Sequence, residues 1–105
     1  MKNLIIIVFG KNEEILQTLK RIIGGTNGWQ AIIHQDLATC KEYLSNYPSD
    51  ILLLSSGLSD QDETEIVNHL AYLDHTIGLI KHYGGGSGLL KNEIYSLFPD
   101  LVLNK

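Results

Sequence analysis

The sequence lacks the cysteine pairs that small extracellular domains use for stability. Cys40 is the only cysteine among 105 residues, so no internal disulfide can form, and we expect the protein in the reducing cytoplasm. Long hydrophobic runs are also missing. The apolar run from Leu4 to Phe9 stops too early to cross a membrane and is not followed by a small-residue cleavage pattern. A membrane is therefore not an expected partner.

Basic residues are scarce as well. Eight lysine and arginine residues are scattered among twelve aspartate and glutamate residues, which gives a formal net charge of -4. Binding to a nucleic-acid backbone needs a basic patch or stripe, so we expect no nucleic-acid partner. The apolar share of 44% is ordinary for a folded domain, and a chain of this length can form one hydrophobic core. We therefore expect a single domain over residues 1–105.

Short apolar runs alternate with helical patterns along the whole chain. Strands are expected at residues 4–9, 29–34, 51–54, 77–83 and 101–103. The first and third are almost wholly apolar, as buried parallel strands are, whereas the second is more polar and suits an edge.

Four helices are expected between these strands. Asn12 and Asp36 are predicted N-caps of the first two, and Asp60 or Asp62 starts the third. Gly24-Gly25 ends the first helix and Pro48 closes the second. The second should turn Leu37, Cys40, Leu44 and Tyr47 inward, and the third Ile66, Val67, Leu70 and Leu73. The last helix is expected over residues 89–98.

This alternation predicts an α/β fold, because strands joined by helices form a parallel sheet with right-handed crossovers. Five strands in this rhythm fit a doubly wound sheet of the flavodoxin-like order 2-1-3-4-5. In such a sheet, ligands bind at the carboxyl ends of the strands, where the strand order reverses. We expect any functional site there.

The third strand and the loop after it carry a family resemblance. Residues 50–63 read DILLLSSGLSDQDE, a buried strand, a short loop and a helix start. This segment resembles the receiver (CheY-like) domain of bacterial response regulators, in which a phospho-accepting aspartate follows the third strand. Ser55 stands at that place here. A serine hydroxyl without a base beside it is a weak nucleophile, so the resemblance implies a receiver fold that has lost aspartyl phosphorylation.

Other family positions point the same way. Receivers place two acidic residues after the first strand to hold Mg2+, and Phe9 and Gly10 stand there. We therefore expect no metal and no cofactor. The hydroxyl residue that ends the family's fourth strand falls near Lys81 or His82, and the family lysine after the fifth strand is matched by Lys105 with the register off by about one residue.

The resemblance also implies a fifth helix that this sequence does not supply. Its loss would leave an apolar strip near the third, fourth and fifth strands open to water, and large bare strips are rare on monomers. We expect a homodimer or another protein partner to cover the strip. The alternative is closure within the chain by Tyr72, Tyr95 and Phe98, or by a shifted crossover.

The cleft expected at the strand ends is neutral to basic and rich in hydrogen-bond donors. Its glycine run leads into a helix N-terminus, which attracts anions. A phosphate-bearing ligand would be held there by Lys11, Ser55, Ser56, His82, Gly84, Gly85, Gly86, Ser87 and Gly88. The run matches neither a Walker loop nor the GxGxxG fingerprint. A flexible connector, or a turn that needs positive φ, explains the same glycines.

Other candidate side chains point to structure. His34, His69, His75 and His82 lack the spacing of a zinc set. Cys40 shares its helical phase with apolar residues and is expected to pack. Tyr43 and Tyr47 are four apart and are expected to pack along one helix.

Three functions compete on this basis. The leading hypothesis is a degenerate receiver-like domain that acts as a protein-interaction or regulatory module in signalling. The second is a small binder of a phosphate-bearing ligand. An enzyme is not expected, because no nucleophile and base are paired.

Overall fold

The computed structural model describes residues 4–55, 57–73 and 77–81. Within them the chain forms four strands and three helices. The strands are β1 (Leu4–Phe9), β2 (Trp29–His34), β3 (Ile51–Leu54) and β4 (Gly78–Lys81). The helices are α1 (Glu13–Gly24), α2 (Leu37–Asn46) and α3 (Asp60–Ala71).

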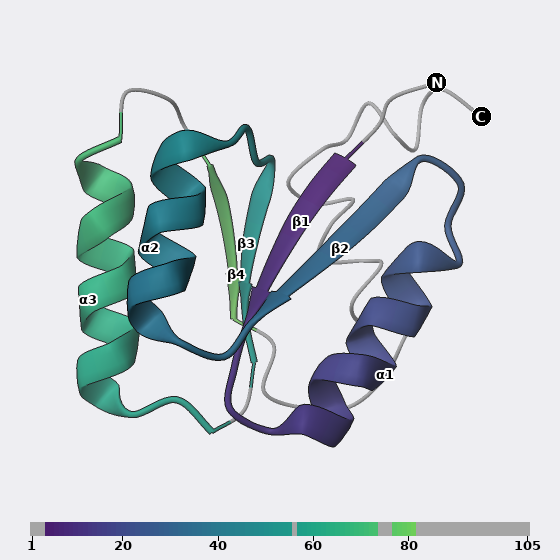
Figure 1. The fold of residues 1–105 in the computed structure, drawn as a ribbon, viewed down its shortest axis with the longest axis horizontal. Coiled ribbons are helices and arrows are strands. Elements are labelled where there is room, and N and C mark those ends of the chain that lie inside the picture. Colours follow the sequence, from purple (N-terminus) through teal and green to yellow (C-terminus); the bar gives the residue numbers. More distant parts are fainter. Residues whose placement is uncertain (1–3, 56, 74–76, 82–105) are drawn as a thin grey trace.

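All described strands run parallel, in the order β2-β1-β3-β4. The predicted α/β class with a parallel sheet is thereby confirmed. Helix α1 lies on one side of the sheet, and α2 and α3 lie on the other (Figure 1). The helix predicted at residues 89–98 and the strand predicted at 101–103 lie outside the described residues.

The helices begin where the sequence predicts them, because polar side chains satisfy their first N–H groups. Asn12 Oδ1 accepts from Ile15 N–H at 3.1 Å, and Asp36 Oδ2 accepts from Thr39 N–H at 3.0 Å. Helix α3 begins at Asp60, as expected, and Ser59 is its N-cap in a capping box. Local cap chemistry thus sets the start of all three described helices.

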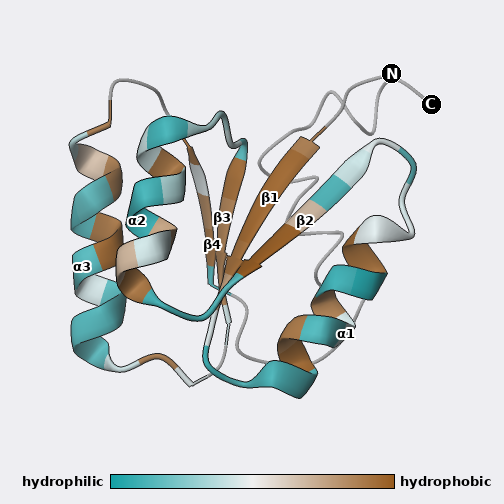
Figure 2. Cartoon of the chain, viewed as in Figure 1, coloured by the Kyte–Doolittle hydropathy of each residue, from teal (hydrophilic) through white to brown (hydrophobic). Residues whose placement is uncertain are grey.

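The sheet separates two apolar clusters. One joins β1 and β3 to α1 through Leu16, Leu19 and Ile23, and the other joins them to α2 and α3 through Cys40, Leu44 and Ile66. Strands β1 and β3 are apolar along their length, whereas the helices alternate apolar and polar residues (Figure 2). This pattern is typical of central parallel strands that are covered on both faces.

The predicted inner face of α2 is wrong at one position. Tyr47 is 56% exposed. Helix α2 ends at Asn46, and the backbone of Tyr47 is extended, so its side chain does not continue the inward face of the helix. The ring stacks on Tyr43 instead, with the centroids 4.6 Å apart. The expected packing of these two tyrosines is confirmed. On α3 the predicted inner face holds, since Ile66 is buried and Val67, Leu70 and Leu73 pack beside it.

The strip that was expected to be bare is covered where the structure describes it. Ile51, Leu53 and Ile80 lie on the α1 side of β3 and β4 and are buried within a single copy of the chain. Tyr72 does not supply this cover, because it is 85% exposed. Tyr95 and Phe98 lie outside the described residues.

No helix in the described ranges is long and apolar enough to cross a lipid bilayer.

Candidate functional site

The carboxyl ends of β1 and β3 meet where the strand order reverses. Ser55 N–H donates to Phe9 O at 2.8 Å, which extends the β1–β3 ladder by one residue and sets Ser55 beside the start of the 10–12 loop. Gly10 N–H donates in turn to His34 O at 3.2 Å. Three strand ends are thereby tied together by main-chain bonds, and this edge is where a doubly wound sheet binds its ligands.

Ser55 is enclosed at this edge. Its side chain is 0% exposed, and its Oγ has no hydrogen-bond partner. A buried hydroxyl without a partner costs about 1–3 kcal/mol of stability. The described residues place no base beside this Oγ, so the hydroxyl stays a weak nucleophile.

Phe9 stands where the resemblance noted from the sequence would place an acidic residue. Its side chain is 0% exposed and packs in the apolar cluster under α2 and α3. Mg2+ needs carboxylate and water oxygens, and an enclosed phenyl ring offers none. Nowhere in the described ranges do three His, Cys, Asp or Glu side chains gather closely enough to hold a metal ion.

Lys11 lies at the edge, and its charged end bonds to the connection between β2 and α2. The Nζ donates to Gln35 O at 2.5 Å and stands 6.0 Å from the centroid of the Phe9 ring, at the limit of a cation–π contact. The stem of Lys11 passes close to the loop after β3, since a Cβ on Gly57 would lie 2.9 Å from Lys11 Cβ. Lys11 thus joins the loop after β3 to the β2–α2 connection through its stem and its ammonium.

Two residues of this edge escaped the sequence reasoning. The Gln35 side-chain amide donates to the Glu13 carboxylate, and the Gln35 carbonyl accepts from Lys11. Glu13 also accepts from Gln17 Nε2 at 3.2 Å. No local pattern marks Gln35, because its role depends on the β2–α2 connection passing beside the start of α1.

The end of β4 carries a different feature. Lys81 Nζ lies 2.9 Å from Glu63 Oε1, and both line an open groove of about 320 Å3 beside α3. Lys81 was one of two candidates for the family's hydroxyl position, and here it forms an ion pair with the helix. The remaining predicted site residues, Ser56, His82 and the glycine run 84–88, lie outside the described residues.

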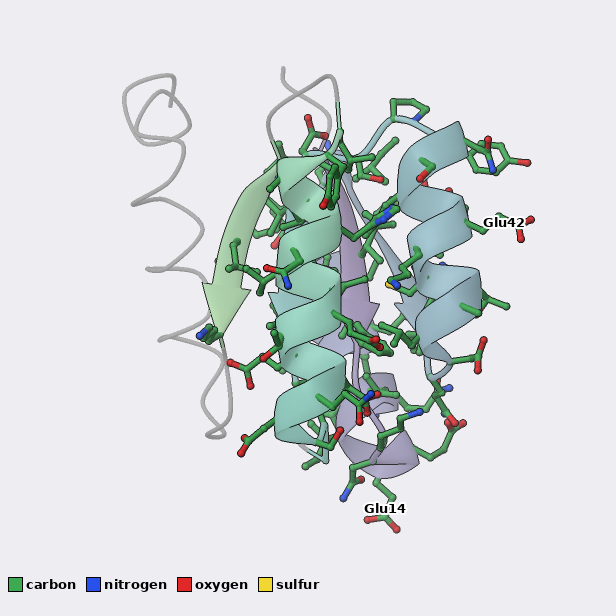
Figure 3. All side chains as sticks on the ribbon, turned by 90° about the vertical axis from the view of Figure 1, so that its left-hand side faces the viewer. Glu14 and Glu42 are labelled. Atoms are coloured by element: carbon green, nitrogen blue, oxygen red, sulfur yellow. The ribbon has the colours of Figure 1, made fainter. Side chains whose placement is uncertain are left out.

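The other candidate side chains have structural roles where they are described. Burial raises the pKa of the Cys40 thiol to about 12, so Cys40 is packed and poorly nucleophilic, in agreement with its expected role. His69 joins α2 to α3, because its Nε2 lies 2.9 Å from Ser45 Oγ and 3.0 Å from Lys41 O. The two helices lie side by side, with Glu42 pointing outward from α2 (Figure 3).

His34 ends β2 at the same edge. Burial lowers the pKa of its imidazole, and the buried Nε2 has no hydrogen-bond partner. The ring stands 5.2 Å from the Tyr43 ring, centroid to centroid. His34 is therefore a neutral packing residue at neutral pH. His75 and His82 lie outside the described residues.

No protein-family model, curated protein or solved structure matches this chain.

Proposed function

We propose that this chain is a degenerate receiver-like domain that serves as a protein-interaction or regulatory module and is not controlled by aspartyl phosphorylation. The observation that carries the proposal is that uncharged side chains fill the sheet edge where the strand order reverses. Phe9 and Ser55 are both fully buried there, at the positions where the receiver resemblance would place carboxylates. Phosphoryl transfer to a receiver needs those carboxylates and their Mg2+.

The fold supports this proposal through its connectivity. The described order β2-β1-β3-β4 is the first part of the flavodoxin-like order 2-1-3-4-5, and we propose that residues 101–103 add the fifth strand. We also propose that the domain works in the cytoplasm and is not itself an enzyme. The free, buried thiol of Cys40 suits a reducing compartment.

A phosphodonor experiment tests the loss of receiver chemistry. The full chain is incubated with Mg2+ and acetyl phosphate beside a working receiver domain, and intact masses are measured. We expect no added phosphate on this chain and one on the control. Beryllofluoride with Mg2+ should likewise leave its melting temperature unchanged. A phosphate mapped to Ser55, or a beryllofluoride-dependent rise in melting temperature, would overturn the proposal.

A second function has one observation in its favour. The Oγ of Ser55 is a buried polar atom without a hydrogen-bond partner, and it lies at the edge where the strand order reverses. A ligand oxygen that reached this edge could form a hydrogen bond with it. We therefore propose, as the alternative, a binder of a phosphate-bearing ligand held by Lys11, Ser55, Ser56 and the 84–88 glycine run. For this role Lys11 must give up its bond to Gln35 O.

Thermal stability decides between the two functions. Inorganic phosphate, nucleotides and sugar phosphates are tested singly, and a ligand at a hundred times its Kd should stabilise the fold by about 2.7 kcal/mol. Under the alternative, Ser55→Ala and Lys11→Ala should abolish the shift. Under the leading proposal no phosphate compound shifts the melting temperature, and Ser55→Ala is neutral or stabilising because it removes an unsatisfied hydroxyl.

A further inference from the structure

Strand β2 forms an edge of the described sheet, and its outer side carries unused main-chain groups. Leu4 N–H donates to Gly28 O at 2.9 Å, and hydrogen-bonding direction alternates along a parallel strand. The even-numbered residues of β2 therefore bond to β1. The N–H and C=O groups of Ala31 and Ile33 point the other way, and no described strand lies on that side.

An open groove of about 560 Å3 follows this edge. One wall is β2 from Trp29 to Ile33, and the other consists of Gln17, Lys20 and Gly24. These three residues share one face of α1, since they are three and four apart. Helix α1 lies beside β2, on the opposite side of the sheet from α2 and α3 (Figure 1). The groove thus combines a strand edge with a helix wall.

The edge also lacks the features that keep sheet edges from pairing. Exposed edges are usually protected by lysine, other charges, proline or a bulge. Residues 29–34 read WQAIIH, with no lysine, arginine, carboxylate or proline, and the β1–β2 register is continuous from Leu4 to Phe9. The second half of β2 is strongly hydrophobic (Figure 2), and Ile32 and Ile33 are only half-buried.

We propose that this edge binds an extended segment of a partner polypeptide, which adds to the sheet as a strand beside β2. The inference rests on the proposed interaction role and names the surface that performs it. The outward main-chain groups of Ala31 and Ile33 fix the segment in the extended conformation, because only a strand presents matching groups at that spacing.

The groove also fixes the side chains of the partner. Successive side chains of an added strand point to opposite faces, so apolar residues at alternate positions meet Ile33 on the α1 face. Among the described residues that line the groove, Lys20 alone carries a charge. A carboxylate on the partner, two residues from an apolar position on the α1 face, would complement that charge.

A displayed library of linear nonapeptides is panned against the immobilised full chain, and the enriched sequence is synthesised as the probe. We expect alternate apolar residues with an aspartate or glutamate on the α1 face. Amide hydrogen exchange by NMR should show new protection at Ala31 and Ile33 when the peptide is added. Gln30 and Ile32, which already bond to β1, should be protected in both states.

Matched variants test the geometry. Ile33→Pro removes an outward N–H while leaving the β1 ladder intact, since edge strands tolerate proline at such positions. It should weaken peptide binding by about tenfold or more, the loss expected for a blocked main-chain bond. Ile33→Val keeps the N–H and should bind as the wild type does. Lys20→Glu should select basic residues in place of acidic ones.

Three results would overturn the inference. They are a library that yields no binder, a binder that leaves the Ala31 and Ile33 amides unprotected, and a chain that dimerises through these amides without peptide. Circular dichroism shows whether Ile33→Pro is folded, and the exchange measurement needs no variant. Phosphorylation of Ser55 in the phosphodonor experiment would refute the proposed function alone. It has no bearing on the amide exchange measured at Ala31 and Ile33.

Discussion

The substitution Gly57→Ala probes how the loop after β3 meets the loop after β1. Gly57 has φ +93°, a conformation that residues with a Cβ rarely adopt. A Cβ at this position would also lie 2.9 Å from Lys11 Cβ, with Lys11 Cα at 3.4 Å and Asn12 N at 3.5 Å. Two separate penalties therefore act at one residue.

The backbone penalty is about 1–2 kcal/mol for placing alanine in the left-handed region. The close contact adds about 1–3 kcal/mol, the usual cost of overpacking. Gly57→Ala should thus lower the free energy of unfolding by about 2–5 kcal/mol. A small domain is stable by only about 5–15 kcal/mol, so the loss should be readily measurable.

Urea unfolding followed by circular dichroism measures the loss. The double variant Lys11→Gly, Gly57→Ala removes the contact and keeps the backbone penalty, so a double-mutant cycle should return the contact term of about 1–3 kcal/mol as its coupling. Gly24→Ala is the control: nothing lies within 4 Å of its added Cβ, and alanine there should stabilise α1 by up to about 1 kcal/mol. A cost at Gly57 below about 0.5 kcal/mol would refute both penalties.

Three further predictions concern side chains that are buried or partly buried. Asp50→Ala should cost about 1–3 kcal/mol in urea unfolding, because Asp50 Oδ2 accepts from Ile5 N–H at 2.8 Å, and Asp50→Asn should recover most of it. Burial raises the pKa of Cys40 to about 12, so stability should fall above about pH 8.5, where only the unfolded thiol ionises. Burial lowers the pKa of His34, so stability should fall below about pH 6.5, where the unfolded chain binds the proton more readily.

Each of these predictions has a contradicting result. Equal losses for Asp50→Ala and Asp50→Asn would show that the bond to Ile5 does not matter. Fast reaction of Cys40 with a thiol reagent at pH 8, under conditions where the chain stays folded, would contradict its burial. An unchanged pH profile in His34→Gln would assign the acid-side loss of stability to other groups.

The sequence predicts the described elements closely because their signals are local. The apolar runs of β1 and β3, and the caps at Asn12 and Asp36, act within a few residues and need no information from the rest of the chain. Tyr47 shows the limit of such reasoning. Its helical phase predicts an inward side chain, but α2 ends one residue earlier and the phase no longer applies.

The candidate site is less predictable because its contacts join distant segments. The position of Ser55 at the end of β3 follows from the sequence, whereas its unpartnered Oγ depends on how the three strand ends close around it. The sequence predicts that Lys11 binds an anion beside Ser55, and it gives no sign of a role for Gln35. Their bond spans 24 residues, and only the packing of the β2–α2 connection against α1 brings the two together.

The direction of Lys11 fits an edge whose buried side chains Phe9 and Ser55 carry no charge. A lysine ammonium in an acidic pocket pairs with a carboxylate, since charge-assisted bonds are the strongest ones available to it. Here Phe9 is apolar and Ser55 is neutral, and the Lys11 ammonium donates to the Gln35 carbonyl. The contacts of Lys11 and Gln35 hold the loops of this edge to one another. Such a closed edge suits the proposed role of a domain that binds through another surface.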